Sequence, residues 1–279
     1  MIVLLWTSQA AAGGFSIQQA SIRANGLMGA FTAFGNHVST IYYNPAGLAT
    51  VENIQFSTGS SLILPETTFH NLTPRAPLGQ VTQRNNDLFV APHLFGSYRV
   101  EEGLTVGIGF YRPFGFRTTW PGNWVGRNSS VEAELSTYFV NPAIGYTLPD
   151  FGIGRIHVGV GLQVAVTGNF RYQAAVTTFT PEGTFNLDTR MQEVSFGFNA
   201  GLIYSPVEII ALGFAYRSPV EVEFKGDADF VDLPVGFPPT ASVSTRIKFP
   251  ASWTGAVNLR LHPRWRAEID VVWWRWSSY

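Results

Sequence analysis

The 279-residue sequence contains no cysteine, so neither a disulfide bond nor a thiolate metal site can form within it. Charged residues make up only 13% of the chain, about half of the usual quarter share. The net charge of −1 provides no basic face for a nucleic-acid partner. Beyond the N-terminus no run of eighteen apolar residues occurs, which excludes helical membrane spans.

Recognisable catalytic and cofactor motifs are also missing. The chain has no GxSxG, HExxH, phosphate-binding loop or dinucleotide fingerprint. Its five histidines are far apart and lack metal-ligand spacing: His37, His70, His93, His157 and His262. We therefore expect no cofactor, no metal and no enzyme activity. A membrane-embedded hydrolase stays open as an alternative, because distant Ser and His residues can meet in space.

The chain does have strict two-residue alternation, which is clearest over residues 156–172. Even-numbered residues there form an apolar set, and odd-numbered residues are small or polar. In a strand these sets lie on opposite faces. Seventeen residues at about 3.3 Å each span roughly 55 Å, much longer than the usual strand of about 5–6 residues. The pattern predicts an all-β transmembrane antiparallel β-barrel whose apolar face contacts lipid.

The same alternation recurs and predicts nine strands in all. They lie at residues 54–64, 88–100, 104–110, 138–148, 156–172, 194–204, 210–225, 253–261 and 265–273. In the seventh strand, Val220, Val222 and Phe224 are expected on the outward face. Short connections at 101–103, 149–155, 205–208 and 262–264 alternate with long ones at about 65–87, 115–133, 173–191 and 226–246. Such alternation is typical of an outer-membrane barrel with its short turns on the periplasmic side.

Nine is an odd number, whereas a single-chain bacterial barrel normally closes with an even number of strands. Open edges leave backbone groups unpaired in lipid, so we expect further C-terminal strands beyond this sequence. Residues 1–12 resemble the remnant of a signal peptide, with an apolar N-terminal strand as the alternative. Residues 13–50 are rich in Gly and Ala and too apolar for a free tail, so the barrel lumen is expected to bury them.

Several short motifs, in order along the chain, carry a resemblance to a known family. They are Gly13-Gly14-Phe15, the segment 25–30, the STIYYNPAG segment 39–47, and the segments 111–115, 124–127, 141–146, 215–219 and 276–277. In this combination the chain resembles the FadL/TodX outer-membrane transporters of long-chain fatty acids and aromatic hydrocarbons.

The resemblance implies a fourteen-stranded barrel, of which residues 51–279 cover about nine strands, and an N-terminal hatch at residues 13–50. It further implies capture of substrate in an apolar groove on the outer loops and transfer to an interior pocket beside the hatch N-terminus. Release would then follow sideways, through a kink in the third strand. Residues 35–38 replace the family's more usual acidic stretch, which leaves the hydrogen bonding of the hatch open.

Asn44, Pro45 and Ala46 are the expected hatch residues. Proline fixes φ and lacks an N–H, and asparagine bonds the backbone near turns, so this tripeptide is suited to a tight plug turn. An ordinary turn is the alternative. Phe15, by its match to the family's mature N-terminus, is expected to line the interior pocket, with a mobile terminal residue as the alternative.

The remaining substrate-binding residues are expected together on one long loop: Phe114, Phe116, Trp120 and Trp124. Large aromatic side chains on an exposed loop are costly unless they bind an apolar molecule or a membrane. We therefore expect an outer capture groove, with a self-packed loop as the alternative. Pro113 and Gly115 end the third strand and are candidates for the side portal.

Five charged residues on the polar faces are expected to pair with one another in the lumen: Arg171, Arg217, Glu221, Glu223 and Lys225. Arg217 or Lys225 is also a candidate for binding a substrate carboxylate.

The predicted function is passive transport of hydrophobic molecules across the outer membrane, most of all long-chain fatty acids, driven by about 0.8 kcal/mol per buried methylene. The expected partners are the hydrophobic substrate, outer-membrane lipid and lipopolysaccharide, with no nucleic acid, and the protein is expected to be a monomer. An aromatic-hydrocarbon channel of the same fold, a general porin, a membrane-embedded hydrolase and a secreted β-sandwich are the alternatives. The sequence does not distinguish between fatty acids and aromatic hydrocarbons.

Overall fold

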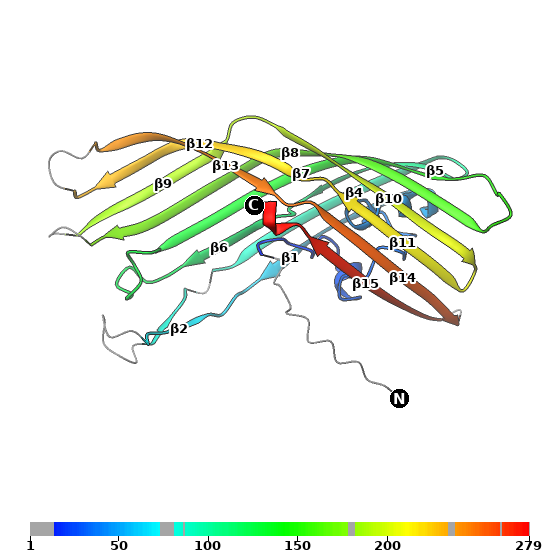
Figure 1. Cartoon of the computed structure of the whole chain (residues 1–279), viewed down its shortest axis with the longest axis horizontal. Helices are drawn as coiled ribbons and strands as arrows, with labels where there is room; N and C mark the ends of the chain where they lie inside the picture. The colour runs from blue at the N-terminus through cyan, green and yellow to red at the C-terminus, as the bar shows by residue number, and fades with distance from the viewer. Residues whose placement is uncertain are drawn as a thin grey trace.

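The computed structural model describes residues 14–72, 81–85, 87–177, 182–233, 238–262 and 264–278 (Figure 1). The predicted signal-peptide remnant at residues 1–12 lies outside these ranges. None of the helices in the described part of the chain is long and apolar enough to cross a membrane.

Short helices lie near the N-terminus: α1 (Ile22–Asn25), α2 (Thr40–Tyr43) and the 3₁₀ helix η1 (Pro45–Thr50). The first strands are β1 (Ile54–Ile63), β2 (Thr68–His70), β3 (Val81–Gln83), β4 (Phe89–Glu101), β5 (Leu104–Tyr111), β6 (Gly115–Thr119), β7 (Glu132–Thr147) and β8 (Arg155–Val176). They are followed by β9 (Gly183–Met191), β10 (Ser195–Val207), β11 (Ile210–Arg217), β12 (Val220–Val231), β13 (Thr240–Phe249), β14 (Ser252–His262), β15 (Trp265–Trp274) and the 3₁₀ helix η2 (Trp276–Ser278).

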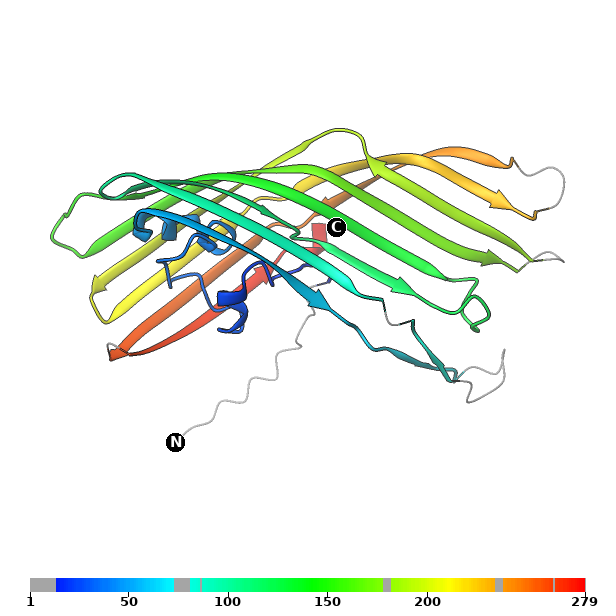
Figure 2. The same ribbon diagram turned by 180° about the vertical axis from the view of Figure 1, so that it is seen from behind.

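Most strands join one large antiparallel sheet. Its main path runs β1-β4-β5-β7-β8-β10-β11-β14-β15, which follows the predicted strand order. The sheet continues through β6, which pairs with β7, and through β9, β12 and β13, while β2 and β3 form a separate hairpin. Figures 1 and 2 show the long strands tilted and curved around the N-terminal segment. The all-β antiparallel fold predicted from the sequence is confirmed.

The segments expected as long loops contain further strands. β6 lies within 115–133, β9 lies within 173–191, and β12 and β13 fill much of 226–246. In β9, β12 and β13 the outward-facing residues are mostly polar and the apolar set faces inward, so the outward apolar face that marks the rest of the sheet ends there. The short turns gather at the opposite end of the molecule (Figure 1).

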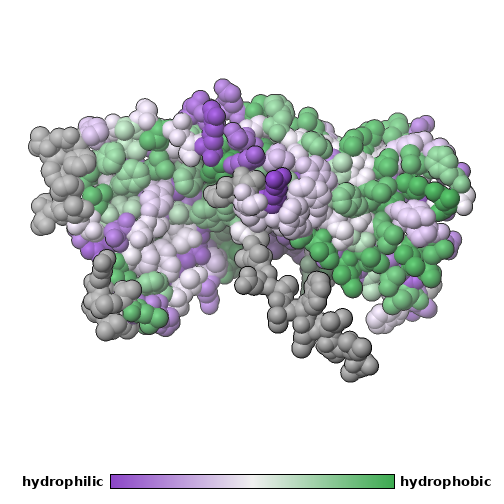
Figure 3. Space-filling view, in the orientation of Figure 1, coloured by the Kyte–Doolittle hydropathy of each residue, from purple (hydrophilic) through white to green (hydrophobic). Residues whose placement is uncertain are grey.

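Toward the short turns, the outer face of the sheet is apolar and uncovered in the described part of the chain. Val160 is 55% exposed, Leu162 is 47% exposed and Phe214 is 48% exposed. Figure 3 shows apolar side chains spread widely over the surface seen in that view. Even-numbered residues in the first half of β8 therefore face outward, as the alternation predicts.

Side-chain alternation reverses partway along β8. Tyr138 of β7 pairs with Thr167, but the next residue, Phe139, pairs with Ala165, so Val166 is an extra residue in β8. One extra residue forms a β-bulge and turns the following side chains over. Ala165 and Gly168 are consequently both buried, three residues apart. The prediction of uninterrupted alternation over residues 156–172 is wrong beyond this bulge.

A second reversal lies where β11 gives way to β12 at Ser218-Pro219 and β13 to β14 at Pro250-Ala251. Proline has no N–H to donate to the ladder, so a strand readily breaks there. Beyond the break, three side chains are almost fully buried: Val220 (2% exposed), Val222 (0%) and Phe224 (0%). Their predicted outward orientation is wrong, because the break turns them into the interior core.

Residues 14–50, which we call the hatch segment, pack inside the curved sheet, and η1 contacts β5, β7, β8 and β10. Glycines on the inner face permit this close approach. A Cβ at Gly159 would lie 2.3 Å from the carbonyl carbon of Pro45, and one at Gly201 would lie 1.8 Å from Asn44 Oδ1. The wall is therefore shaped to accept the turn that contains Asn44 and Pro45.

Candidate functional site

Asn44 fixes the turn between α2 and η1. Its side chain is fully buried, and Nδ2 donates to the carbonyl oxygens of Thr32 (2.7 Å) and Leu202 (3.2 Å). Its Oδ1 accepts a hydrogen bond from the Ala46 N–H at 3.1 Å. Pro45 follows at the first position of η1, where a missing N–H costs nothing. The expected hatch residues therefore join two parts of the hatch segment to strand β10.

Arg217 lies buried between the hatch segment and the wall. Its Nη2 donates to the Tyr42 carbonyl oxygen at 2.6 Å, and its Nη1 donates to the Tyr111 hydroxyl at 3.3 Å. The guanidinium carbon also lies 4.6 Å from the centroid of the Tyr42 ring. Tyr111 in turn donates to Asn141 Oδ1 at 3.0 Å. Among the described residues no carboxylate forms an ion pair with Arg217, so neutral groups hold this cation inside the sheet.

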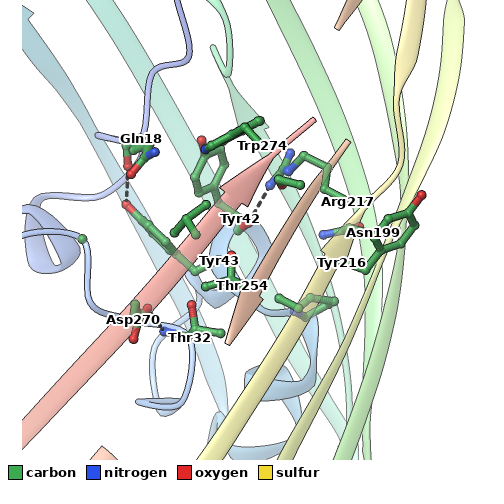
Figure 4. A pocket seen from close by; sticks show the side chains of 15 residues that line it. Gln18, Thr32, Tyr42, Tyr43, Asn199, Tyr216, Arg217, Thr254, Asp270 and Trp274 are labelled. Atoms are coloured by element: carbon green, nitrogen blue, oxygen red, sulfur yellow. Dashed lines mark hydrogen bonds between the residues drawn. The ribbon is translucent and has the colours of Figure 1, made fainter. Parts of the chain in front are cut away.

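A small cavity adjoins this arginine (Figure 4). Its volume is about 50 Å³, and its lining includes Arg217, Tyr42, Asp270 and Trp274. This volume suffices for a few waters and is far below the roughly 300–1,000 Å³ of a site for a drug-sized ligand. A larger ligand enters only if neighbouring side chains move.

Rings from three distant parts of the chain meet inside the sheet. The Phe15 ring centroid lies 6.2 Å from Phe114, 5.9 Å from Phe116, 6.2 Å from Phe249 and 5.0 Å from Trp276. Phe114 stacks on Phe249 with centroids 4.4 Å apart and an interplanar angle of 12°. We call these five residues the interior aromatic cluster. Three of the predicted substrate-binding residues, Phe15, Phe114 and Phe116, thus come together.

The third strand of the main path is interrupted beside this cluster. β5 ends at Tyr111, opposite Phe139, and β6 begins at Gly115, opposite Ser136. Four residue steps on one side therefore match three on β7, so the β5–β6 side carries one extra residue. The predicted departure from regular pairing around Pro113 is present.

The N-terminal segment and an arginine occupy this interruption. The Ile17 N–H donates to the Pro113 carbonyl oxygen at 2.7 Å, and the Gly115 N–H donates to the Phe15 carbonyl oxygen at 3.0 Å. Arg112 donates to the carbonyl oxygens of Val90 on β4 and Leu135 on β7, each at 3.1 Å. Backbone and guanidinium together fill the site at which a side portal is expected.

Trp120 and Trp124 form a separate outer aromatic cluster with Phe69. The two indoles stack 4.5 Å apart at 13°, and the Phe69 ring lies 5.4 Å from Trp124. Trp124 is only 8% exposed, and its Nε1 donates to the Ser130 carbonyl oxygen at 2.8 Å. The four aromatics expected in one groove are therefore divided between two clusters, and the outer one packs largely on itself.

An ion pair fastens the same outer region. Arg127 Nη2 lies 2.6 Å from Glu182 Oε1, and Arg127 Nε donates to Glu182 Oε2 at 3.0 Å. The hydrogen bond from this guanidinium holds the pKa of the Glu182 carboxyl below its ordinary value. The pair joins the loop after β6 to the segment before β9.

Four of the five charges expected in the lumen lie elsewhere. Arg171, Glu221 and Lys225 are exposed and Glu223 is partly exposed, all on the outward side of the reversed strands. Arg171 pairs with Asp188 at 3.6 Å, and Glu223 pairs with Lys225 at 3.1 Å. The lumen prediction is wrong for these residues, because the alternation reverses before each of them. Of the five, Arg217 alone is buried inside.

Several residues of the site were not predicted. Tyr42 and Tyr111 belong to motifs that were recognised, but nothing in those motifs shows that their side chains meet. Arg112 looks like an ordinary strand-end cation in the sequence. Phe249 precedes a proline and carries no local signal, because its role depends on contact with Phe114, which is remote in the sequence.

Comparisons with known proteins agree with this architecture. The chain matches a family model described as outer membrane protein transport protein (OMPP1/FadL/TodX) over residues 3–279. A putative outer membrane protein of Neisseria meningitidis serogroup B is 28% identical over 255 residues, which cover 82% of this chain and 55% of that protein. The long-chain fatty acid transport protein of Salmonella typhi is 23% identical over 313 residues, covering 99% of this chain and 69% of that protein.

Solved structures show the same fold. A FadL homologue from Pseudomonas aeruginosa superposes with a TM-score of 0.74 at 18% identity, covering 95% of this chain and 70% of the other. The CymD monoaromatic hydrocarbon channel superposes with a TM-score of 0.68 at 16% identity, covering 91% and 68%. The chain thus spans about half the length of the Neisseria relative and about two thirds of the others.

Proposed function

Because this chain belongs to the OMPP1/FadL/TodX family of outer-membrane transport proteins, we propose that it carries hydrophobic small molecules, chiefly long-chain fatty acids, passively across the outer membrane. The chain is an outer-membrane protein, as its relatives are described to be. The interior aromatic cluster around Phe15 is the single observation that supports the proposal most. Its rings pack together inside the sheet, and a solute that parts them meets only apolar groups, which favours apolar solutes over the polar solutes of a general porin.

The proposed route begins at the outer aromatic cluster of Phe69, Trp120 and Trp124. Substrate binds there first and then moves inward to Phe15 and the rings packed on it. Release takes place sideways at the interrupted third strand, after residues 15–17 and Arg112 withdraw from it. Each of these steps is passive, and the proposal includes no catalytic reaction.

Arg217 supports fatty acids as the substrate class. A buried cation that donates to a carbonyl and a hydroxyl oxygen gains more by donating to a carboxylate, because charge-assisted hydrogen bonds are roughly twice as strong. The guanidinium also lines the small interior cavity, so a carboxylate that enters there reaches it. Aromatic hydrocarbons are the second candidate, favoured by the edge-on and stacked rings of the interior aromatic cluster.

We also propose a monomer that contacts outer-membrane lipid and lipopolysaccharide directly. A row of aromatic rings crosses four neighbouring strands on the outer face: Phe198, Tyr216, Trp253 and Trp273, with successive centroids 5.6, 5.2 and 4.7 Å apart. Such rows are typical of the membrane–water interface.

Uptake measurements test the function. Host cells whose own fatty-acid uptake protein has been deleted, and which produce this protein instead, are expected to take up labelled oleate. They are not expected to take up a small labelled sugar. A Phe114→Ala/Phe249→Ala variant is expected to lower oleate uptake, whereas the exposed Trp265→Ala control leaves it unchanged. Sugar uptake without oleate uptake contradicts the proposal and supports a porin. Toluene uptake without oleate uptake supports the aromatic-hydrocarbon alternative, and ester hydrolysis by the purified protein supports the hydrolase.

A further inference from the structure

Three consecutive backbone N–H groups of the hatch segment point at two carboxylates on β15. The Phe31 and Thr32 N–H groups both donate to Asp270 Oδ2 at 3.1 Å. The Ala33 N–H donates to Glu268 Oε1 at 2.8 Å. Successive N–H groups that point the same way bind carboxyl oxygens well, and here the carboxyl groups belong to the barrel wall.

The wall also holds Glu268 and contacts Phe34, the residue after the triplet. Asn258 Nδ2 donates to the second oxygen of Glu268 at 2.6 Å, so that carboxylate is held from both sides. Two guanidinium groups lie near the Phe34 ring, those of Arg23 and Arg266, each 5.1 Å from its centroid. Residues 266, 268 and 270 of β15 therefore each contact the stretch 31–34.

The expected hatch signature holds the same stretch from its other side. The Thr32 carbonyl oxygen accepts from Asn44, while the Thr32 N–H donates to Asp270. Figure 4 shows Asp270 bonded to Thr32 at the edge of the interior cavity. Gly213 lets the wall approach closely, since a Cβ there would lie 3.0 Å from the Ala33 Cβ.

This stretch separates two cavities. Thr32 and Asp270 line the small interior cavity beside Arg217. Ala33, Phe34 and Arg266 line a cavity of about 760 Å³ on the other side, whose wall includes the short turns near residues 150–155 and 205–210. A change in the position of residues 31–34 would join the two spaces.

We propose that Glu268 and Asp270 form a carboxylate latch that seats residues 31–34 of the hatch segment and seals the interior from the short-turn end of the barrel. The two are positioning residues for transport: they touch the hatch and not the cargo. With the latch closed, cargo has no axial path and leaves the interior by another route. The inference concerns closure alone, so it holds whichever hydrophobic molecule is carried.

Isosteric amides weaken the latch with little change in side-chain shape. In an Asp270→Asn/Glu268→Gln variant each carboxyl group loses one acceptor oxygen, and the new NH₂ groups donate where the hatch also donates. We expect the ionic conductance of the purified protein in planar bilayers to rise about tenfold over the parent. The matched control is Glu221→Gln/Glu223→Gln, two outward carboxylates of β12, which is expected to conduct as the parent does.

A reversible tether separates latch opening from damage to the barrel. The chain has no cysteine, so Ala33→Cys and Gly213→Cys introduce the only two thiols. Oxidation of this pair in the amide variant is expected to return conductance to the parent level, and reduction is expected to raise it again. The heat-dependent gel mobility of each variant reports whether its sheet is folded.

Two results would overturn the proposal. One is parent-level conductance in a folded amide variant, and the other is raised conductance that persists when the tether is oxidised. If the double amide variant does not fold, Asp270→Asn alone decides the matter, because it removes the acceptor of two of the three N–H groups. It is expected to raise conductance about threefold, and an unchanged value overturns the latch. Oleate uptake is measured separately, so its loss or retention bears on the proposed function and not on the latch.

Discussion

Replacement of Arg217 with methionine is expected to remove any preference for a free carboxylate and to leave binding of the apolar chain intact. Methionine is unbranched and flexible, so it fills much of the space of the arginine stem. The change removes the two hydrogen bonds to Tyr42 and Tyr111 and the only buried cation among the five charges expected in the lumen. Binding of oleate compared with methyl oleate isolates the charge, because the two ligands share one hydrocarbon chain.

The expected magnitude follows from the contacts of the guanidinium. A hydrogen bond to a charged group contributes about 1.5–3 kcal/mol, so loss of the charged partner should weaken oleate binding by roughly ten- to a hundredfold. Methyl oleate should bind equally to both proteins. Stability should change by no more than about 2 kcal/mol, because the unpaired oxygens of Tyr42 and Tyr111 are offset by relief of a buried cation.

Equilibrium binding of radiolabelled ligands to the purified protein in detergent measures both affinities. Arg246→Met is the matched control, since the Arg246 side chain is 69% exposed on the outer face. An equal loss of affinity for oleate and methyl oleate would show that the arginine acts through packing. No loss for either ligand would show that the carboxylate binds elsewhere, and either result refutes the reasoning.

Three further predictions concern other parts of the site. Phe114→Ala should lower the free energy of unfolding by about 3–5 kcal/mol in urea titrations, because the ring is 2% exposed and stacked on Phe249; a loss below about 1 kcal/mol would contradict its core role. Glu182 has a lowered pKa, so its pairing with Arg127 contributes stability above its ordinary pKa of 4.5 and loses it as the pH falls through the lower folded value. The rate of protease cleavage in the outer loops of the parent protein should therefore rise as the pH falls from about 5 to about 3. The Glu182→Gln variant should show no such rise. Gly201→Ala should displace Asn44, whose Oδ1 would lie 1.8 Å from the new Cβ, and should expose the hatch segment to protease, whereas Gly255→Ala, with open space around it, should not.

The order of the strands was predictable because lipid on one face imposes a period of two on every span. The orientation of their outer halves was not. A single extra residue such as Val166 leaves composition unchanged, yet it turns Arg171 from the expected lumen face to the outside. The break at Ser218-Pro219 and the matching break at Pro250-Ala251 also reverse which side chains face inward. Such breaks are recognised only when the neighbouring strands are aligned in register.

The candidate site was predictable where a local turn determines it. Asn44 and Pro45 form their turn through contacts with residues nearby in the sequence, so the turn can be predicted from the sequence. The grouping of aromatics was not, because contacts of Phe114 with Phe15 and Phe249 span most of the chain. The same holds for Asp270, whose two backbone donors lie more than two hundred residues away.

The break at Ser218-Pro219 makes chain length, and not only residue type, critical at that level of the wall. If a strand of the present length ran unbroken through Ser218 and Pro219, simple alternation would place the acidic side chains of β12 on the face of Arg217, against the rings of Phe249 and its neighbours. A relative with an unbroken strand would therefore need one residue fewer at this point to keep the interior beside β12 apolar, because the same chain length would line that interior with carboxylates.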